Sequence, residues 1–196
     1  MKYTIGPMAK KQLILGSTSK YRYELLSRLG YSFKALPPLI DEEKEKKPSL
    51  TPIALAENLA FLKAQSLAKE GLIVIGGDQL VACEGRIIGK AHTKEKAIEQ
   101  LLSMTGKPHD LITAICVTDG NQVYRHTDIT RLFMKNLNQE LVEKYVHLDE
   151  PIDCAGSYKI EKHGIALFDK IESQDFTAIQ GLPLIALNKI LENIVL

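Results

Sequence analysis

Hydrophobic and polar positions along this chain follow two different periods, which predict helices and strands that succeed one another. Short apolar runs rich in β-branched residues predict strands at residues 12–16, 32–36, 72–75, 86–88, 110–118, 122–134 and 165–171. Apolar residues three or four positions apart predict helices at residues 20–29, 51–69, 93–103, 138–147 and 183–194. The pattern therefore predicts an α/β fold.

The run at 72–75 is apolar throughout, which is typical of a central strand buried on both faces. We expect this strand to end at Gly76, because two glycines and the polar pair Asp78-Gln79 follow it. Charged residues between prolines predict a loop at 41–47. The chain has 196 residues without a repeat or low-complexity tract, which corresponds to one domain.

The composition excludes several classes of protein. The formal net charge of +1 gives no broad basic surface, so nucleic-acid and membrane partners are not expected. The 3 cysteines are scattered and have no metal-ligand spacing, which argues against a disulfide framework or a zinc site. No apolar run approaches the ~20 residues of a membrane helix, and residues 1–11 lack the apolar core of a signal peptide. We expect a cytoplasmic protein.

The turn after the first strand is a candidate anion site. Small residues lead into a helix there, and the first turn of a helix has unpaired N–H groups that attract anions. Ser17 and Ser19 are candidate helix caps, and Arg22 adds a positive charge suited to phosphate oxygens. Taken alone, an ordinary helix cap explains this turn better, because serine caps are common.

Asp78 is the strongest single candidate for chemistry. A carboxylate that follows a buried strand and two glycines could bind a divalent metal or act as a general base. The alternative is a polar residue in a turn. The uniformly apolar strand before it favours a functional role.

Three further charged residues are ambiguous by themselves. Lys90 follows Gly89 in an incomplete phosphate-loop pattern, and it could neutralise a phosphate or simply be solvated. Lys63 lies in an apolar helix and is expected at the edge of its buried face. Glu42, next to Asp41, would be a solvated residue if judged alone.

Eight short segments, in this order between residues 13 and 191, resemble the Maf family of nucleotide pyrophosphatases. They are Gly16-Ser17-Thr18-Ser19 with Arg22 and Glu24-Leu25-Leu26, Asp41-Glu42, Lys63-Ala64, Gly77-Asp78-Gln79, Gly89-Lys90, Thr105-Gly106 with His109, Cys154-Ala155-Gly156-Ser157-Tyr158, and Gly181-Leu182-Pro183-Leu184. Each segment is weak alone, and their ordered combination is highly specific.

The resemblance implies an elongated single domain with a mixed, bent sheet, as in inosine-triphosphate pyrophosphatases, in which two lobes flank a cleft. We expect this domain at residues 12–196 after an N-terminal extension at 1–11. The family cuts nucleoside triphosphates between the α- and β-phosphates with a divalent cation, Mg²⁺ or Mn²⁺. The resemblance also makes a homodimer an expectation.

The resemblance also assigns roles to residues at matching positions. Ser17, Arg22, Lys63 and Lys90 would hold phosphates. Glu42 and Asp78 would coordinate the metal or the attacking water, with Asp78 as general base. Catalytic roles are thus implied for Asp78, Glu42, Lys63 and Lys90.

Three residues resemble the subfamily that acts on 7-methylguanosine triphosphate. They are Tyr21, where that subfamily usually has tryptophan, Gln79 and Glu161. A methylated guanine is cationic, so an aromatic face and a carboxylate are suitable partners. The implied substrate is 7-methyl-GTP. A pyrimidine substrate such as dTTP or UTP, and a nucleotide-binding regulator of cell division with little catalysis, are the alternatives.

Overall fold

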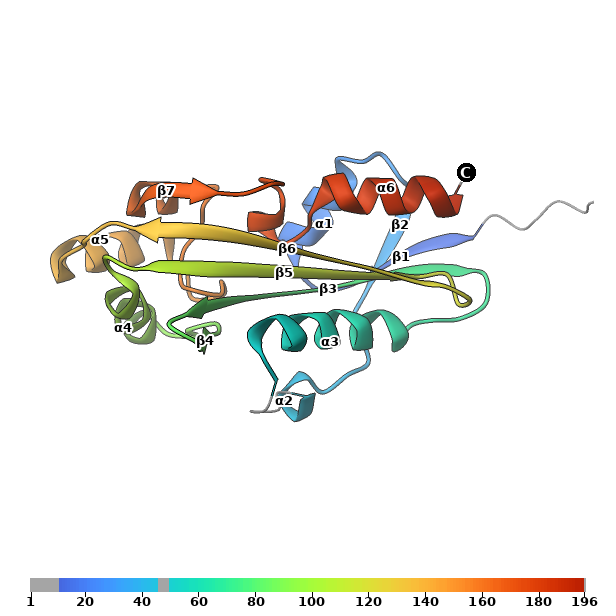
Figure 1. Cartoon of the computed structure of the whole chain (residues 1–196), viewed down its shortest axis with the longest axis horizontal. Coiled ribbons are helices and arrows are strands. Elements are labelled where there is room, and N and C mark those ends of the chain that lie inside the picture. Colours follow the sequence, from blue (N-terminus) through green and yellow to red (C-terminus); the bar gives the residue numbers. More distant parts are fainter. Residues whose placement is uncertain (1–10, 46–49, 196) are drawn as a thin grey trace, which may run out of the picture.

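One mixed β-sheet runs along the long axis of the molecule and carries helices on both faces (Figure 1). The computed structural model describes residues 11–45 and 50–195. The sheet has seven strands in the order β2-β1-β3-β5-β6-β7, and β4 pairs with the end of β3. The strands are β1 (Gln12–Gly16), β2 (Phe33–Leu36), β3 (Leu72–Cys83), β4 (Arg86–Ile88), β5 (Pro108–Thr118), β6 (Val123–Met134) and β7 (Phe168–Glu172).

The sheet is parallel at one edge and antiparallel elsewhere. β1 pairs in parallel with β2 and β3, whereas β3, β5, β6 and β7 form an antiparallel series. The predicted α/β class, with an elongated single body and a mixed sheet, is confirmed. No helix in the described part of the chain is long and apolar enough to cross a membrane.

The helices divide between the faces and ends of the sheet (Figure 1). At one end, α3 covers one face, and α1 and α6 cover the opposite face. At the other end lie α4 and α5. The α-helices are α1 (Lys20–Ser27), α2 (Glu42–Glu45), α3 (Pro52–Gln65), α4 (Lys94–Met104), α5 (Gln139–Asp149) and α6 (Leu184–Val195), and the short 3₁₀ helices are η1 (His163–Leu167) and η2 (Ala178–Gln180).

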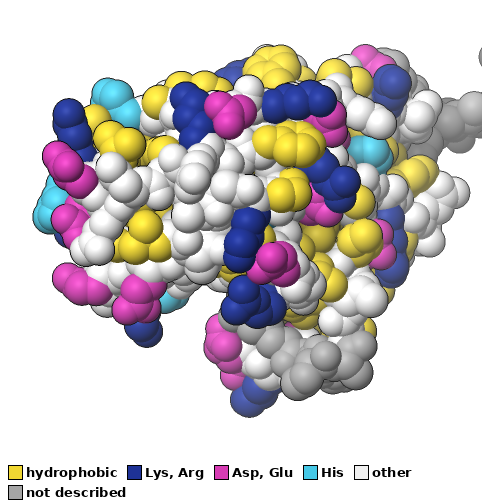
Figure 2. Space-filling view, turned by 60° about the vertical axis from the view of Figure 1, so that its left-hand side comes forward, with side chains coloured by type: hydrophobic (Ala, Val, Ile, Leu, Met, Phe, Trp, Pro, Cys, Tyr) yellow, Lys and Arg dark blue, Asp and Glu magenta, His cyan; other side chains and the backbone are white. Residues whose placement is uncertain are grey.

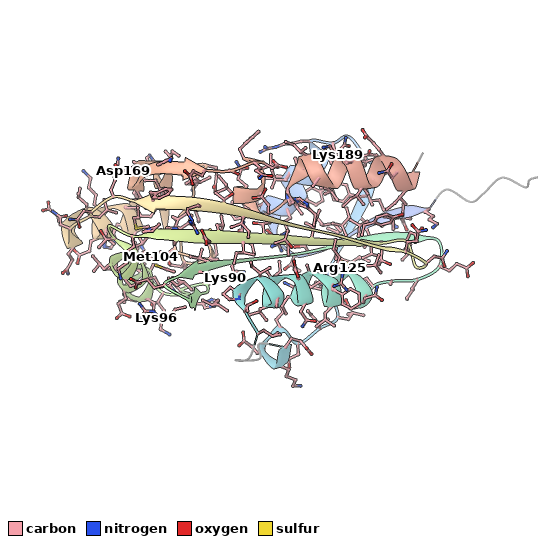
Figure 3. All side chains as sticks on the ribbon, viewed as in Figure 1. Lys90, Lys96, Met104, Arg125, Asp169 and Lys189 are labelled. Carbon is pink, nitrogen blue, oxygen red and sulfur yellow. The ribbon has the colours of Figure 1, made fainter. Side chains whose placement is uncertain are left out.

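Helix α3 packs unusually close to β3. Thr51 caps its first turn by accepting a hydrogen bond from the Ala54 N–H. A Cβ atom at Gly76 of β3 would lie 2.2 Å from the Ala60 carbonyl oxygen, so only glycine permits this approach. On the same face, Arg125 of β6 stacks over Phe61 of α3, with 4.4 Å from the guanidinium carbon to the ring centroid (Figure 3). The close packing brings Lys63 of α3 directly over the strand.

The structure corrects several predicted boundaries. The strand expected to end at Gly76 continues to Cys83, because the two glycines accommodate neighbours on both faces without leaving the ladder. The predicted loop at 41–47 contains α2. The helix predicted at 51–69 ends at Gln65. The first residues of the strand predicted at 165–171 belong to η1, and β7 follows. Of the predicted N-terminal extension at 1–11, only residue 11 lies within the described residues. The two lobes around a cleft stay a prediction.

Candidate active site

Asp78 and Gln79 lie in the middle of β3 and point to opposite faces of the sheet. Asp78 contacts Lys63 of α3, with 2.7 Å between Oδ1 and Nζ. Gln79 contacts η2 on the other face, with 2.9 Å between its Nε2 and the Ala178 carbonyl oxygen. One long strand therefore carries two adjacent polar side chains into separate environments.

Lys63 joins two carboxylates on the α3 face. Its Nζ lies 2.7 Å from Asp78 Oδ1 and 3.0 Å from Glu42 Oε1. The Lys63 and Asp78 side chains are 7% and 11% exposed, while Glu42 is 45% exposed. Lys63 is thus buried in an ion pair, not at the edge of the buried face of its helix as predicted, because the last turns of α3 pack against Gly76. Burial raises the pKa of the Asp78 carboxyl above its usual range, against the opposing charges of Lys63 and Arg22.

Arg22 of α1 packs on the Gln79 side of β3, where its Nε would lie 3.4 Å from a Cβ atom at Gly77. Its Nε donates to the Gly181 carbonyl oxygen at 3.0 Å, and its Nη1 donates to Ser17 Oγ at 3.5 Å. Burial lowers the pKa of the Arg22 guanidinium, while the charges of Asp78 and Glu42 act in the opposite sense. The guanidinium thus lies on the Gln79 side and still interacts electrostatically with both carboxylates.

Serine hydroxyl groups in the turn after β1 accept hydrogen bonds from nearby backbone N–H groups. Ser19 is the cap of α1 and accepts a hydrogen bond from the Arg22 N–H at 3.4 Å. Ser17, the other predicted cap, instead accepts the Ser19 N–H at 3.1 Å and is nearly buried. Ser17 thus lies within hydrogen-bond reach of Arg22 and supports the turn.

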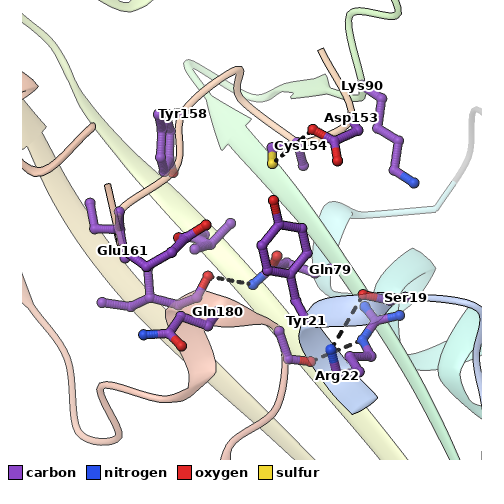
Figure 4. A pocket seen from close by; sticks show the side chains of 15 residues that line it. Ser19, Tyr21, Arg22, Gln79, Lys90, Asp153, Cys154, Tyr158, Glu161 and Gln180 are labelled. Carbon is purple, nitrogen blue, oxygen red and sulfur yellow. Dashed lines mark hydrogen bonds between the residues drawn. The ribbon is translucent and has the colours of Figure 1, made fainter. Parts of the chain in front are cut away.

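A pocket on the Gln79 side brings together five of the predicted residues (Figure 4). They are Tyr21, Arg22, Gln79, Lys90 and Glu161. In the close-up, Glu161 lies on one side of the Tyr21 ring, and Lys90 and Asp153 lie on the other. Lys90 lies near the middle of the long axis (Figure 3), where its backbone bridges to Ala155 in the loop that lines the pocket.

The two carboxylates of the pocket differ in their pairing. Asp153 lies 3.1 Å from the buried Lys159 ammonium. Glu161 has no ion pair within the part of the chain that the structure describes. Burial raises the pKa of the Tyr21 hydroxyl, so this ring stays neutral beside Glu161. The negative charge of Glu161 is therefore available to a cation in the pocket.

Charged groups of both signs also border a hollow on the molecular surface (Figure 2).

A sequence family model for Maf-like proteins matches residues 12–194. The chain belongs to the Maf family. Its curated relatives include proteins named 7-methyl-GTP pyrophosphatase from three bacteria.

The relative from Bdellovibrio bacteriovorus is 73% identical and spans 95% of this chain and 98% of its own. That from Bordetella pertussis is 42% identical and spans 94% and 93%. That from Vibrio parahaemolyticus is 39% identical and spans 94% and 96%. A solved HAM1 protein from Coxiella burnetii is 14% identical, has a TM-score of 0.43, and covers 65% of this chain and 74% of its own.

The donor set of this Maf protein suits a hard divalent cation on the α3 face. Glu42 and Asp78 supply carboxylate oxygens, which are the ligands that Mg²⁺ and Mn²⁺ prefer. The described residues form no group of three or more His, Cys, Asp or Glu that could enclose a metal. Two carboxylates still fit Mg²⁺, which usually takes one or two of them together with substrate phosphates and water.

Two residues of this site were missed by the sequence analysis. Thr113 of β5 is 1% exposed and contacts both Gln79 and η2. Its only sequence signal was one hydroxyl inside an apolar strand. Asp153 lines the pocket directly before the Cys154-Ala155-Gly156 segment, and that position was the available signal. Ser17 does not line this pocket, and Glu42, Lys63 and Asp78 meet on the α3 side of the sheet instead.

Proposed function

We propose that this chain is a nucleoside triphosphate pyrophosphatase that hydrolyses 7-methyl-GTP to 7-methyl-GMP and pyrophosphate. The observation that carries the proposal is one pocket lined by the Tyr21 ring, by Arg22 and Lys90, and by the Glu161 carboxylate, which has no ion pair among the described residues. The names of relatives up to 73% identical support it.

The pocket offers what a 7-methylguanine base requires. The base is cationic, so the Tyr21 ring provides an aromatic face and Glu161 provides an opposite charge. Glu161 can also accept hydrogen bonds from the N1–H and amino groups of guanine. A thymine or uracil base has no positive charge and would leave the Glu161 carboxylate without a counter-charge.

The cations around the pocket suit the triphosphate. Arg22 and Lys90 line the pocket itself, and Lys63 lies beside Asp78 on the opposite face of the sheet. Arg22 presents a planar group for bidentate phosphate binding, and Lys90 adds a point charge. Ser17 supports Arg22 through the contact between its hydroxyl and Nη1.

Glu42 and Asp78 would hold a divalent cation, Mg²⁺ or Mn²⁺. When bound, such an ion neutralises phosphate charge and polarises the phosphoanhydride. The Asp78 carboxylate would accept the proton of the attacking water. Lys63 holds that carboxylate in place through the contact between Nζ and Oδ1.

Pyrophosphate release from a nucleotide panel, with Mg²⁺ and with Mn²⁺, tests the proposal. We expect 7-methyl-GTP to have the highest kcat/KM among 7-methyl-GTP, GTP, ATP, dTTP and UTP. A preference for dTTP or UTP would contradict the proposed substrate and leave the proposed reaction unchanged. No pyrophosphate from any nucleotide would favour the alternative of a nucleotide-binding regulator.

An Asp78→Asn variant provides the active-site control. It should bind nucleotide and release pyrophosphate at least about a hundredfold more slowly, as is typical for loss of a general base. Asp119→Asn is a matched control, because Asp119 also pairs with a lysine, Lys11, at 2.8 Å, but in the turn between β5 and β6. The expected homodimer and cytoplasmic location stay predictions.

A further inference from the structure

The side-chain amide of Gln79 has its nitrogen against three oxygen acceptors. Nε2 lies 2.9 Å from Thr113 Oγ1, 2.9 Å from the Ala178 carbonyl oxygen and 3.1 Å from the Ile179 carbonyl oxygen. Two of these acceptors are backbone carbonyls of η2, which cannot donate. If the amide turned over, its oxygen would face those carbonyls without any hydrogen bond.

Thr113 further restricts the orientation of the Gln79 amide. A threonine hydroxyl has a single proton, and that of Thr113 is donated to the Ala178 carbonyl oxygen at 3.0 Å. Towards Gln79 the hydroxyl can therefore only accept. Thr113 is 1% exposed, so no water can exchange easily into this arrangement.

The amide oxygen of Gln79 is consequently directed at the pocket. No hydrogen bond among the described residues uses Oε1. A Cβ atom at Gly181, in the pocket wall, would lie 4.0 Å from Oε1. Figure 4 draws the Gln79 side chain beside the Tyr21 ring in this wall. The pocket thus has two acceptors, Gln79 Oε1 and the Glu161 carboxylate, that receive no hydrogen bond from any residue the structure describes.

We propose that Thr113 is a positioning residue that holds the Gln79 amide with its oxygen towards the pocket, so that the pocket selects a purine with two adjacent N–H donors on its Watson–Crick edge. Guanine has two such groups there, N1–H and the 2-amino group, whereas adenine has one amino donor, at C6, beside an acceptor at N1. Two fixed acceptors would meet the donors of guanine and would repel the N1 lone pair of adenine. This inference rests on the proposed function for the nucleotide. It adds a reason why the pocket would select guanine over adenine.

Kinetics with a matched pair of nucleotides tests the inference. 7-Methyl-GTP and 7-methyl-ATP share the methyl group, the cationic ring and the triphosphate, and they differ at the Watson–Crick edge. We expect Thr113→Val to lower the kcat/KM ratio between them about tenfold, mainly through a higher KM for 7-methyl-GTP. Thr113→Ser keeps the hydroxyl and should keep the ratio. Thr118 is a buried threonine of the same strand, and its hydroxyl bonds to the β5–β6 turn. Thr118→Val should therefore also keep the kcat/KM ratio.

A double variant separates positioning from a general structural effect. If Thr113 acts through Gln79, adding Thr113→Val to Gln79→Met should not change the ratio further. An unchanged ratio in Thr113→Val, or an equal loss in the Gln79→Met background, would overturn the inference. If Thr113→Val does not fold, as judged by its unfolding transition, Thr113→Ala takes its place.

Nuclear magnetic resonance tests the same contact without any turnover. The side-chain amide protons of Gln79 should exchange slowly with solvent in the native chain and at least about tenfold faster in Thr113→Val. Equal exchange in both proteins would overturn the positioning role. A native chain with slow amide exchange but no pyrophosphate release would instead contradict the proposed function alone.

Discussion

The Lys63 ammonium lies 2.7 Å from the Asp78 carboxylate, and both side chains are almost completely removed from solvent. A buried ion pair loses much of its attraction to the cost of desolvating both charges, but removal of one partner leaves the other charge uncompensated. Glu42 lies 3.0 Å from the same ammonium and is partly exposed. Lys63 is therefore the group on which the charge balance of this face depends.

We predict that Lys63→Met destabilises the protein by about 3–5 kcal/mol, because Asp78 remains buried without its cation. Urea unfolding of the variant measures this change. The double variant Lys63→Met/Asp78→Leu should recover part of the loss, since it removes the buried carboxylate, while Glu42, which also loses Lys63, is partly exposed. A single variant as stable as the native chain would mean that the carboxyl becomes protonated at no cost.

Removal of divalent metal should abolish pyrophosphate release and leave the fold intact. In the proposed function, Glu42 and Asp78 would supply oxygen ligands for the metal, whereas their contacts with Lys63 form without it. A chelator followed by titration with Mg²⁺ or Mn²⁺ measures the requirement. Glu42→Gln should raise the metal concentration at half-maximal rate, and Glu43→Gln, the next residue of α2, serves as the matched variant. Full activity in the chelator would contradict the metal assignment.

Glu161→Gln should lower kcat/KM for 7-methyl-GTP about tenfold and that for GTP much less. The substitution keeps a hydrogen-bond acceptor and removes the negative charge, so only the cationic base loses a partner. Steady-state kinetics with both nucleotides gives the two ratios. Glu192→Gln, on the exposed surface of α6, should change neither. Equal losses for the two nucleotides would show that the charge is not what Glu161 contributes.

Stability should fall below neutral pH because of His109. The ring is 2% exposed, its Nε2 lies 3.2 Å from the Tyr158 hydroxyl, and burial lowers its pKa to about 4. The unfolded chain binds a proton at this histidine near its usual pKa of about 6.5, whereas the folded chain does not until about pH 4. Unfolding therefore takes up a proton between these values, and the stability that is present above pH 6.5 is lost as the pH falls.

Urea unfolding at pH 7.5 and pH 5 measures this effect. His109 accounts for a loss of about 2 kcal/mol between the two values. His109→Gln removes the titrating group, and its stability should depend on pH correspondingly less. The same pH dependence in both proteins would assign it to other groups.

The sequence was sufficient for features that depend on local pattern. The alternating apolar periods located most strands and helices, and the cap Ser19 followed from its position directly before its own helix. The boundary at Gly76 was wrong for a physical reason. Glycine ends a strand in isolation, but here α3 and Arg22 occupy the space that a side chain at Gly76 or Gly77 would need.

What only the tertiary structure decided is which polar residues share a face. Order along the chain placed Asp78 beside Gln79, yet the alternation of a continuous strand sends one to Lys63 and the other to η2. Thr113 and Ala178, far apart from Gln79 in sequence, fix its amide only after β5 and η2 pack against β3. The sequence by itself thus determined the family, the elements and most of the chemical groups. Their pairing and direction depended on long-range packing, which no local pattern contains.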